Sequence, residues 1–191
     1  MDLNGHRVIL GSASPRRKEL LAGLDFDFTV DTGTDCDESY DPATPHEEIP
    51  LRIAEAKSAG FHRPLEDDEI LITADTMVFC DNDIMGKPKT REAAIDMLHR
   101  LSGRVHTVVT GVFIRSNAKS KGFTCTSEVT FKQLADSEIE YYVDKYRPYD
   151  KAGAYGIQEW IGYIGITSIS GSYYNIMGLP VQRLYSAIKD F

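Results

Sequence analysis

The first residues whose types and order could do chemistry stand at the start of a predicted helix. Pro15 suits the first turn of a helix, and Ser14 before it is a favoured N-cap residue. Arg16 and Arg17 then fall at the helix N-terminus, where each cation costs about 0.3–1 kcal/mol because the helix dipole favours negative charge. Together with the hydroxyl of Ser12, this arrangement is typical of an anion site; the alternative is that both arginines are only solvated.

A second candidate is Asp75, a carboxylate inside a strongly β-forming run. The residues around it, 70–79, predict a mostly buried strand. Burying an unpaired carboxylate costs several kcal/mol, so Asp75 needs partners. Two interpretations stay open. Asp75 is either a structural aspartate that accepts hydrogen bonds from backbone amides at a strand end, or a functional carboxylate that acts as a base or a metal ligand.

Other charged positions give weaker signals. Asp37 and Glu38 lie in an acidic loop over residues 31–46, where they could hold a divalent cation or be surface charge. Lys57 falls on the apolar face of a predicted helix, along which its stem could extend. Lys87 is expected in a tight turn beyond the predicted strand that holds the buried carboxylate.

Several common catalytic motifs are missing from the sequence. Gly86-Lys87 lacks the earlier glycine of a P-loop, no G-x-S-x-G elbow occurs, and the five histidines show no metal-binding spacing. The residue types point instead to a phosphorylated small substrate that binds with a divalent metal. The cationic helix start and the lysines suit phosphate groups, and the acidic residues suit the metal. Phosphoanhydride chemistry needs mainly charge neutralisation, positioning and an oriented water.

The composition is that of a soluble globular protein. The chain has 191 residues, of which 42% are hydrophobic and 26% charged, and this excludes disordered and fibrous classes. A net charge of −8 disfavours nucleic acid as a partner, since a polyanion needs a basic face. Three cysteines without a C-x-x-C pair predict reduced thiols. With no apolar leader and no membrane-length apolar run, we expect a cytoplasmic protein that does not bind membranes.

Strands and helices alternate along the chain. The predicted strands span residues 8–10, 25–30, 69–79, 105–114 and 123–131; the predicted helices span residues 15–24, 47–61, 90–101 and 139–146, the last capped by Asp136, and a final helix begins at Pro180. This interleaving predicts an α/β fold with a mixed sheet and flanking helices, in a single domain over residues 1–191.

The candidate residues also lie in motifs that resemble, in order, those of the Maf family of nucleotide pyrophosphatases. The resemblance runs from residue 9 to about residue 184, nearly the whole chain. The matching blocks are Ser12-Ala13-Ser14-Pro15-Arg16-Arg17, Ala74-Asp75-Thr76, Gly86-Lys87-Pro88, Leu101-Ser102-Gly103-Arg104, Asp150 through Gln158, and Ile169-Ser170-Gly171-Ser172-Tyr173 with Gly178-Leu179-Pro180.

The resemblance implies a fold, a reaction and roles for most of the candidates. The fold would be an elongated mixed sheet with flanking helices and a central cleft, related to the inosine-triphosphate pyrophosphatases. The reaction would be hydrolysis of a nucleoside triphosphate between its α and β phosphates, with Mg²⁺ or Mn²⁺ as cofactor and a homodimer as a family-level expectation. Asp75 would accept a proton and Glu38 would serve the metal or the water. The phosphates would be contacted by Ser12, Arg17, Lys57 and Lys87, and Lys87 counts with Asp75 as catalytic.

Three positions also resemble one branch of the family. Arg16, Thr76 and Gln158 match the dTTP/UTP pyrophosphatases, whereas the 7-methyl-GTP branch has an aromatic residue and a glutamine at the first two positions and lacks the third motif. The Gln158 amide could pair with the O4/N3 edge of uracil or thymine. The resemblance therefore implies dTTP, UTP or modified pyrimidine triphosphates as substrates, a house-cleaning activity. The alternatives are a 7-methyl-GTP pyrophosphatase and a non-enzymatic regulator of septum formation.

Overall fold

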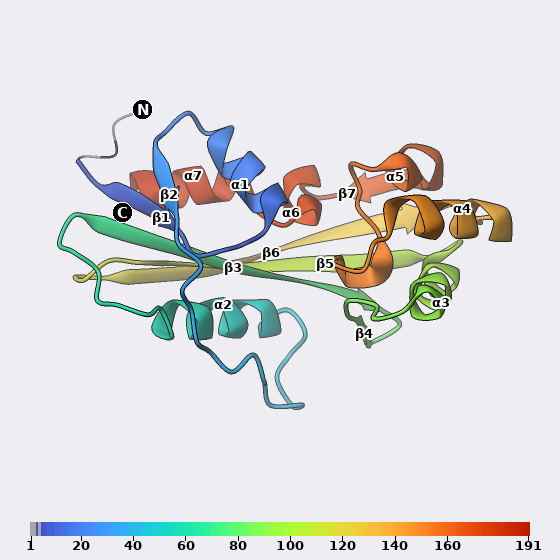
Figure 1. Ribbon diagram of the computed structural model, residues 1–191, viewed down its shortest axis with the longest axis horizontal. Helices are drawn as coiled ribbons and strands as arrows, with labels where there is room; N and C mark the ends of the chain where they lie inside the picture. Colours follow the sequence, from blue (N-terminus) through green and yellow to red (C-terminus); the bar gives the residue numbers. More distant parts are fainter. Residues whose placement is uncertain (1–2, 4) are drawn as a thin grey trace. The chain divides into compact units, whose positions relative to one another are not determined.

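In the computed structural model, which describes residues 3 and 5–191, the strands form one seven-stranded sheet in the order β2-β1-β3-β5-β6-β7, with β4 paired to β3 (Figure 1). β1 pairs in parallel with β2 and β3, whereas β3 with β4 and β6 with β7 are antiparallel. The predicted mixed sheet is confirmed. The strands are β1 (Arg7–Leu10), β2 (Phe28–Val30), β3 (Glu69–Cys80), β4 (Asp83–Met85), β5 (Val105–Arg115), β6 (Ser120–Phe131) and β7 (Ile166–Ser170).

Helices flank the sheet, as the alternation in the sequence predicts. They are α1 (Pro15–Ala22), α2 (Ile49–Ala59), α3 (Arg91–Leu101), α4 (Asp136–Tyr146), the 3₁₀ turn η1 (Ala152–Ala154), α5 (Trp160–Gly165), α6 (Tyr173–Met177) and α7 (Val181–Lys189).

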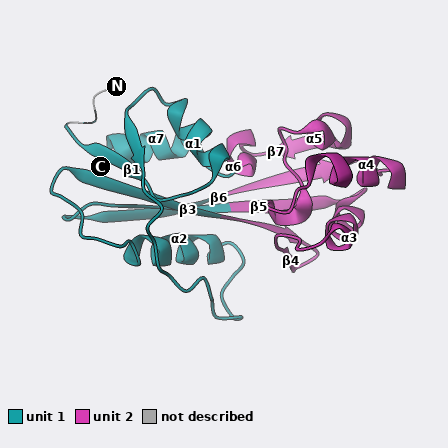
Figure 2. Cartoon of the chain, in the orientation of Figure 1, with its two compact units in different colours: residues 1–75, 110–125, 178–191 teal, residues 76–109, 126–177 magenta. Residues whose placement is uncertain are grey.

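The chain divides into two compact units (Figure 2). The first unit holds the residues up to Asp75, with 110–125 and 178–191, and the second holds 76–109 and 126–177. The long strands β3, β5 and β6 each supply residues to both units. Within the first unit, α1 and α7 lie on one face of the sheet and α2 on the other (Figure 1). The single domain expected from the sequence stays a prediction.

The core of the first unit is built around β3. Its residues Ile70–Ile72 are almost fully buried, because the strand has neighbours on both edges and helices on both faces. The helix α2 is held against β3 by a hydrogen bond from Thr73 Oγ1 to the Ala54 carbonyl at 2.6 Å. On the adjacent β5, a Cβ at Gly111 would lie 2.2 Å from the backbone nitrogen of Leu51, so only glycine permits this close approach of α2.

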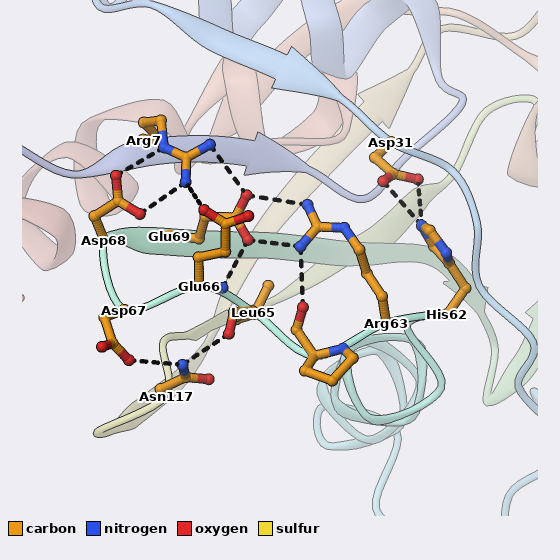
Figure 3. Close-up of polar contacts among 11 residues, drawn as sticks. Arg7, Asp31, His62, Arg63, Leu65, Glu66, Asp67, Asp68, Glu69 and Asn117 are labelled. Atoms are coloured by element: carbon orange, nitrogen blue, oxygen red, sulfur yellow. Dashed lines mark hydrogen bonds and ion pairs between the residues drawn. The ribbon is translucent and has the colours of Figure 1, made fainter.

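An ion-pair network ties the start of β3 to the start of β1 (Figure 3). Glu69 is buried and accepts hydrogen bonds from Arg63 Nη1 at 2.7 Å, Arg63 Nη2 at 3.0 Å and the Glu66 backbone N at 2.9 Å. Arg7 bonds Asp68 and Glu66 in turn. The hydrogen bonds from Arg63 hold the pKa of Glu69 below its usual value. The network holds the first residues of β1 and β3 together. This end of β3 is the one farther in sequence from Asp75.

Some predicted boundaries are wrong. The first helix ends at Ala22 rather than at residue 24, because Gly23 occupies the C-cap and Asp25 takes a left-handed φ of 56°. The second strand spans only Phe28–Val30 of the predicted 25–30, since β1 offers paired partners to those three residues alone.

The cap of α4 also differs from its prediction. Asp136 is the first helical residue, and Ala135 is the N-cap; the Ala135 backbone N donates to Glu138 Oε2 at 2.9 Å. The short elements β4, α5, β7 and α6 were not predicted. β7 lacks alternation, because four of its five residues are exposed, and its strand conformation depends on its pairing with β6.

Two chain-level observations complete the fold. Cys36, Cys80 and Cys125 are all free in the structure. Across residues 3 and 5–191, no helix is both long enough and apolar enough to cross a membrane.

The second unit contains a buried histidine with a strongly shifted pKa. His106 is 2% exposed, its Nε2 lies 2.7 Å from the Tyr155 hydroxyl, and its ring packs against Phe131. Its Nδ1 is buried and has no hydrogen-bond partner among the described residues. Burial lowers the pKa of His106 to about 4, so the imidazole is neutral in the folded protein at neutral pH.

Acidification should therefore destabilise the protein through His106. Below about pH 6.5 the unfolded chain takes up a proton that the folded chain refuses until about pH 4, so stability falls as pH falls across this window. Between pH 7 and pH 5 we expect a loss of about 2 kcal/mol that is absent in His106→Gln, measured by urea unfolding of both proteins. Equal losses in the two proteins would show that His106 does not titrate in this way.

Candidate active site

The helix start of the first unit forms as the sequence predicts. Ser14 is the N-cap of α1, and its Oγ accepts a hydrogen bond from the Arg17 backbone N at 3.4 Å. Ser12 Oγ accepts hydrogen bonds from the Ser14 backbone N at 3.3 Å and from Arg17 Nη1 at 3.2 Å. Arg17 Nε also donates to the Gly178 carbonyl at 2.9 Å. The guanidinium is therefore held in place at the N-terminus of a helix whose first turn has no acidic residue.

The charges around Arg17 affect one another. Burial lowers the pKa of the Arg17 guanidinium, the neighbouring charge of Arg16 lowers it further, and Asp75 and Glu38 oppose the change. Because an arginine starts from a pKa above 12, it keeps its charge at neutral pH. Arg17 thus supplies a fixed positive charge within electrostatic reach of both candidate carboxylates.

Asp75 is paired with Lys57. The Lys57 ammonium, from α2, donates to Asp75 Oδ1 at 2.8 Å, and both side chains are less than one-fifth exposed. The same Nζ lies 3.2 Å from Glu38 Oε1. One lysine therefore joins two carboxylates that are far apart in the sequence. Of the two interpretations of Asp75, this ion pair favours a functional carboxylate over one that caps backbone amides.

The structure separates the adjacent acids Asp37 and Glu38. The Asp37 carboxylate accepts hydrogen bonds from the backbone N of Ser39 at 2.8 Å and from its hydroxyl at 2.7 Å, which lowers the pKa of Asp37. Asp37 thus stabilises its own turn, and Glu38 is the residue that reaches Lys57.

The loop that carries Glu38 is attached to the chain just after α2. His62 Nε2 lies 2.9 Å from Asp31 Oδ2 (Figure 3), and the His62 backbone N donates to the Gly33 carbonyl at 2.8 Å. The Asp35 backbone N donates to the Gly60 carbonyl at 3.0 Å. Because α2 carries Lys57, these bonds bring the acidic loop to the lysine.

The remaining candidates lie in the second unit. Thr76 is half-buried and follows Asp75 on β3, and Lys87 is exposed in the irregular segment after β4, where no turn forms at residues 86–88. Gln158 is half-buried, and its Oε1 is buried with no hydrogen-bond partner among the described residues. A hydrogen bond of 3.1 Å from the Gly153 backbone N to the Gly86 carbonyl joins the segment before Gln158 to the segment that carries Lys87.

The structure thus sorts the predicted residues into two groups. Contacts and charges in the first unit connect one group: Ser12, Arg16, Arg17, Glu38, Lys57 and Asp75. The other group, Thr76, Lys87 and Gln158, belongs to the second unit.

Sequence reasoning missed the residues that surround Gln158. Lys151, Tyr142 and Glu159 form a polar network beside it and received no role. The sequence offered one signal, because Lys151 is a charged residue directly before the largely apolar stretch 152–157. In the structure Lys151 is only 8% exposed, which is rare for a lysine.

Two carboxylates in the first unit have the donor chemistry of a metal site. Within residues 3 and 5–191, no group of three or more His, Cys, Asp and Glu residues could hold a metal ion. Asp75 and Glu38 nevertheless each present an oxygen to one cation, the Lys57 ammonium. Mg²⁺ is commonly held by one or two carboxylates plus substrate phosphates, so these residues fit a metal that binds together with a phosphate substrate.

Comparisons with known proteins show which proteins this chain is similar to. The model of the Maf-like protein family matches residues 7–191. The chain is 54% identical over 190 residues to a dTTP/UTP pyrophosphatase of Parabacteroides distasonis, covering 100% of this chain and 98% of the relative. It is 51% identical over 192 residues to a dTTP/UTP pyrophosphatase of Porphyromonas gingivalis, covering 100% and 96%. Among solved structures, a HAM1 protein from Coxiella burnetii matches 97% of this chain and 100% of that one, at 13% identity and a TM-score of 0.49.

Replacing Lys57 should make the protein respond more strongly to divalent cations. In Lys57→Met, Asp75 and Glu38 lose the positive charge they share, and Mn²⁺ no longer competes with an ammonium for their oxygens. We expect Mn²⁺ to raise the Tm of this variant by about 2–4 °C more than that of the wild type, which corresponds to an additional increase of about 1 kcal/mol in the free energy of unfolding.

Two further variants control for this effect. Lys132→Met also removes a lysine from an ion pair, but its partner is the single carboxylate of Glu138, so its Mn²⁺ response should match the wild type. Adding Glu38→Gln to Lys57→Met should abolish the additional rise, because it removes the more exposed of the two carboxylates that Lys57 contacts. Identical Mn²⁺ shifts in wild type and Lys57→Met would contradict a shared cation site.

Proposed function

Because the chain belongs to the Maf-like protein family, we propose that it is a nucleoside triphosphate pyrophosphatase that hydrolyses dTTP and UTP to the monophosphate and pyrophosphate. The name dTTP/UTP pyrophosphatase of relatives at 50–54% identity supports the substrate. The observation that carries the chemistry is the Lys57 ammonium shared by Asp75 and Glu38. This ion-pair group supports the proposal, because two carboxylates beside a cation are suited to neutralising a phosphoanhydride and to orienting a water molecule.

The first-unit residues divide into those for phosphate and those for water. We assign Ser12, Arg17 and Lys57 to phosphate oxygens, because a fixed guanidinium, a hydroxyl and an ammonium are donors suited to them. We assign Asp75 to the attacking water. Water forms the new bond to phosphorus, the bond from phosphorus to the bridging oxygen between the α and β phosphates breaks, and the Asp75 carboxylate accepts the proton. For Lys87, in the second unit, the phosphate contact that the family resemblance implies stays a prediction.

A divalent cation, Mg²⁺ or Mn²⁺, is part of this proposal. Glu38 is the carboxylate assigned to it, because its side chain is 60% exposed and loses less by leaving Lys57 than the Asp75 side chain, which is 16% exposed, would lose. When bound, the metal supplies positive charge that neutralises the triphosphate. The ammonium of Lys57 is then available to the phosphates.

Recognition of the base is assigned to Gln158 of the second unit, and the roles in substrate choice that the family resemblance implies for Arg16 and Thr76 stay predictions. Uracil and thymine present an N3–H donor and an O4 acceptor, and a glutamine amide can satisfy both at once. The buried Oε1 of Gln158, unpartnered among the described residues, supports its role as the acceptor for N3–H. A buried polar group made to pair with one base edge discriminates against a base that leaves it unpaired.

Two alternative functions remain less well supported. A 7-methyl-GTP pyrophosphatase would share the chemistry but not the pyrimidine edge for which Gln158 is suited. A regulator of septum formation that acts through a partner has no feature of the described residues in its favour. The cytoplasmic location and the homodimer expected from the sequence stay predictions.

Pyrophosphate release from a substrate panel tests the proposal directly. With Mg²⁺ or Mn²⁺, the wild-type protein should release pyrophosphate from dTTP and UTP with a kcat/KM at least about 100-fold above that for ATP, GTP or 7-methyl-GTP, as a hydrogen-bonding site permits. Preference for 7-methyl-GTP would retain the chemistry and overturn the base assignment. A folded protein that releases pyrophosphate from none of the panel would refute the proposed function.

A further inference from the structure

Gln158 sits in a turn whose two ends are held by one hydroxyl group. The turn over Gly156–Glu159 is closed by a hydrogen bond of 3.0 Å from the Glu159 backbone N to the Gly156 carbonyl. The Tyr142 hydroxyl, from α4, accepts a hydrogen bond from the Gly156 backbone N at 3.0 Å and donates one to Glu159 Oε2. Tyr142 is fully buried, and α4 packs against α5, which begins right after the turn (Figure 1).

A buried lysine fixes the other oxygen of the same carboxylate. Lys151 Nζ lies 3.2 Å from Glu159 Oε1 and 2.8 Å from Asp150 Oδ1, and the Lys151 side chain is only 9% exposed. Burial and the Glu159 charge both raise the pKa of Tyr142, so its hydroxyl remains a donor. The fit is close: a Cβ on Gly156 would come within 2.9 Å of Glu159 Cδ. Both oxygens of Glu159 are therefore held by other residues.

A glutamine can discriminate between pyrimidines only if its amide is held. Uracil presents an N3–H donor and an O4 acceptor, whereas cytosine presents an N3 acceptor and an N4–H donor. A half-turn of the Gln158 amide exchanges its oxygen and its nitrogen, so a freely rotating amide pairs equally well with either base. Discrimination therefore requires that the backbone holds Gln158 at one distance and angle from the base, from which only one orientation of its amide can pair.

From these contacts we infer that Tyr142 and Glu159 are positioning residues for base recognition, with Lys151 holding Glu159 in place. By fixing the turn that carries Gln158, they let the enzyme prefer UTP over CTP. This inference rests on the proposed function, in which Gln158 contacts the base. It adds that Tyr142, Glu159 and Lys151 set the preference for UTP over CTP without touching the substrate.

The test is the ratio of kcat/KM for UTP to that for CTP in Tyr142→Phe and Glu159→Ala. Both variants release the turn without altering Gln158. We expect the ratio to fall about tenfold, chiefly through a higher KM for UTP, while kcat stays within about threefold of wild type. In Glu159→Gln, the amide oxygen can still accept the Tyr142 hydroxyl, and we expect most of the ratio to be restored.

Controls separate this effect from loss of stability. Asp144→Asn, two residues from Tyr142 on α4, breaks an exposed ion pair with Arg91 and should leave the ratio unchanged. Gln158→Ala gives the value of the ratio when base recognition is lost. If folded Tyr142→Phe and Glu159→Ala keep the wild-type ratio, or lose activity on both substrates equally, the inference is wrong. A wild-type protein with no preference for UTP, unchanged by Gln158→Ala, would instead overturn the proposed base recognition itself.

Discussion

The charge of Lys57 is the constraint on which the candidate site of the first unit depends. Two like charges brought close together repel each other unless a cation lies between them. The Lys57 ammonium is that cation, at 2.8 Å from Asp75 Oδ1 and 3.2 Å from Glu38 Oε1. The position of this ammonium follows from the packing of α2 on the sheet, which the Thr73 hydrogen bond and the space at Gly111 permit.

Asp75 is a charged residue in an otherwise largely buried strand. It lies in a twelve-residue strand that is buried on either side of the half-exposed residues Asp75–Met77. Partly buried ion pairs are often no more stable than apolar residues of the same volume, because both ions lose hydration. A protein selected for stability alone would have an aliphatic residue here. The polar interruption of β3, paired with Lys57 and within reach of the Arg17 charge, is the kind of local conflict expected at a functional site.

Sequence reasoning succeeded where the signal was local. Ser14 and Pro15 fix the start of α1, and the apolar run around Asp75 predicts β3, because caps and periodicity act within a few residues. The pairing of Lys57 with Asp75 could not be predicted, because helix periodicity shows on which face of the helix Lys57 lies but not which strand packs against that face. Tertiary contacts also decided between the adjacent acids of the acidic loop, and they made strands of segments such as β7. Glu159 was missed because an acidic residue in a turn is usually solvated, and only the fold brings the Tyr142 hydroxyl to it.

The central claim is that the carboxylate held by Lys57 carries out the chemistry, and Asp75→Asn tests it most directly. The substitution keeps the volume and a hydrogen-bond acceptor for Lys57 but removes the base. Pyrophosphate release from UTP should be measured beside the Tm of the variant. The account predicts a folded protein whose kcat is lower by at least about 100-fold, the smaller end of the range for a positioned base. A folded Asp75→Asn with turnover near that of the wild type would contradict it.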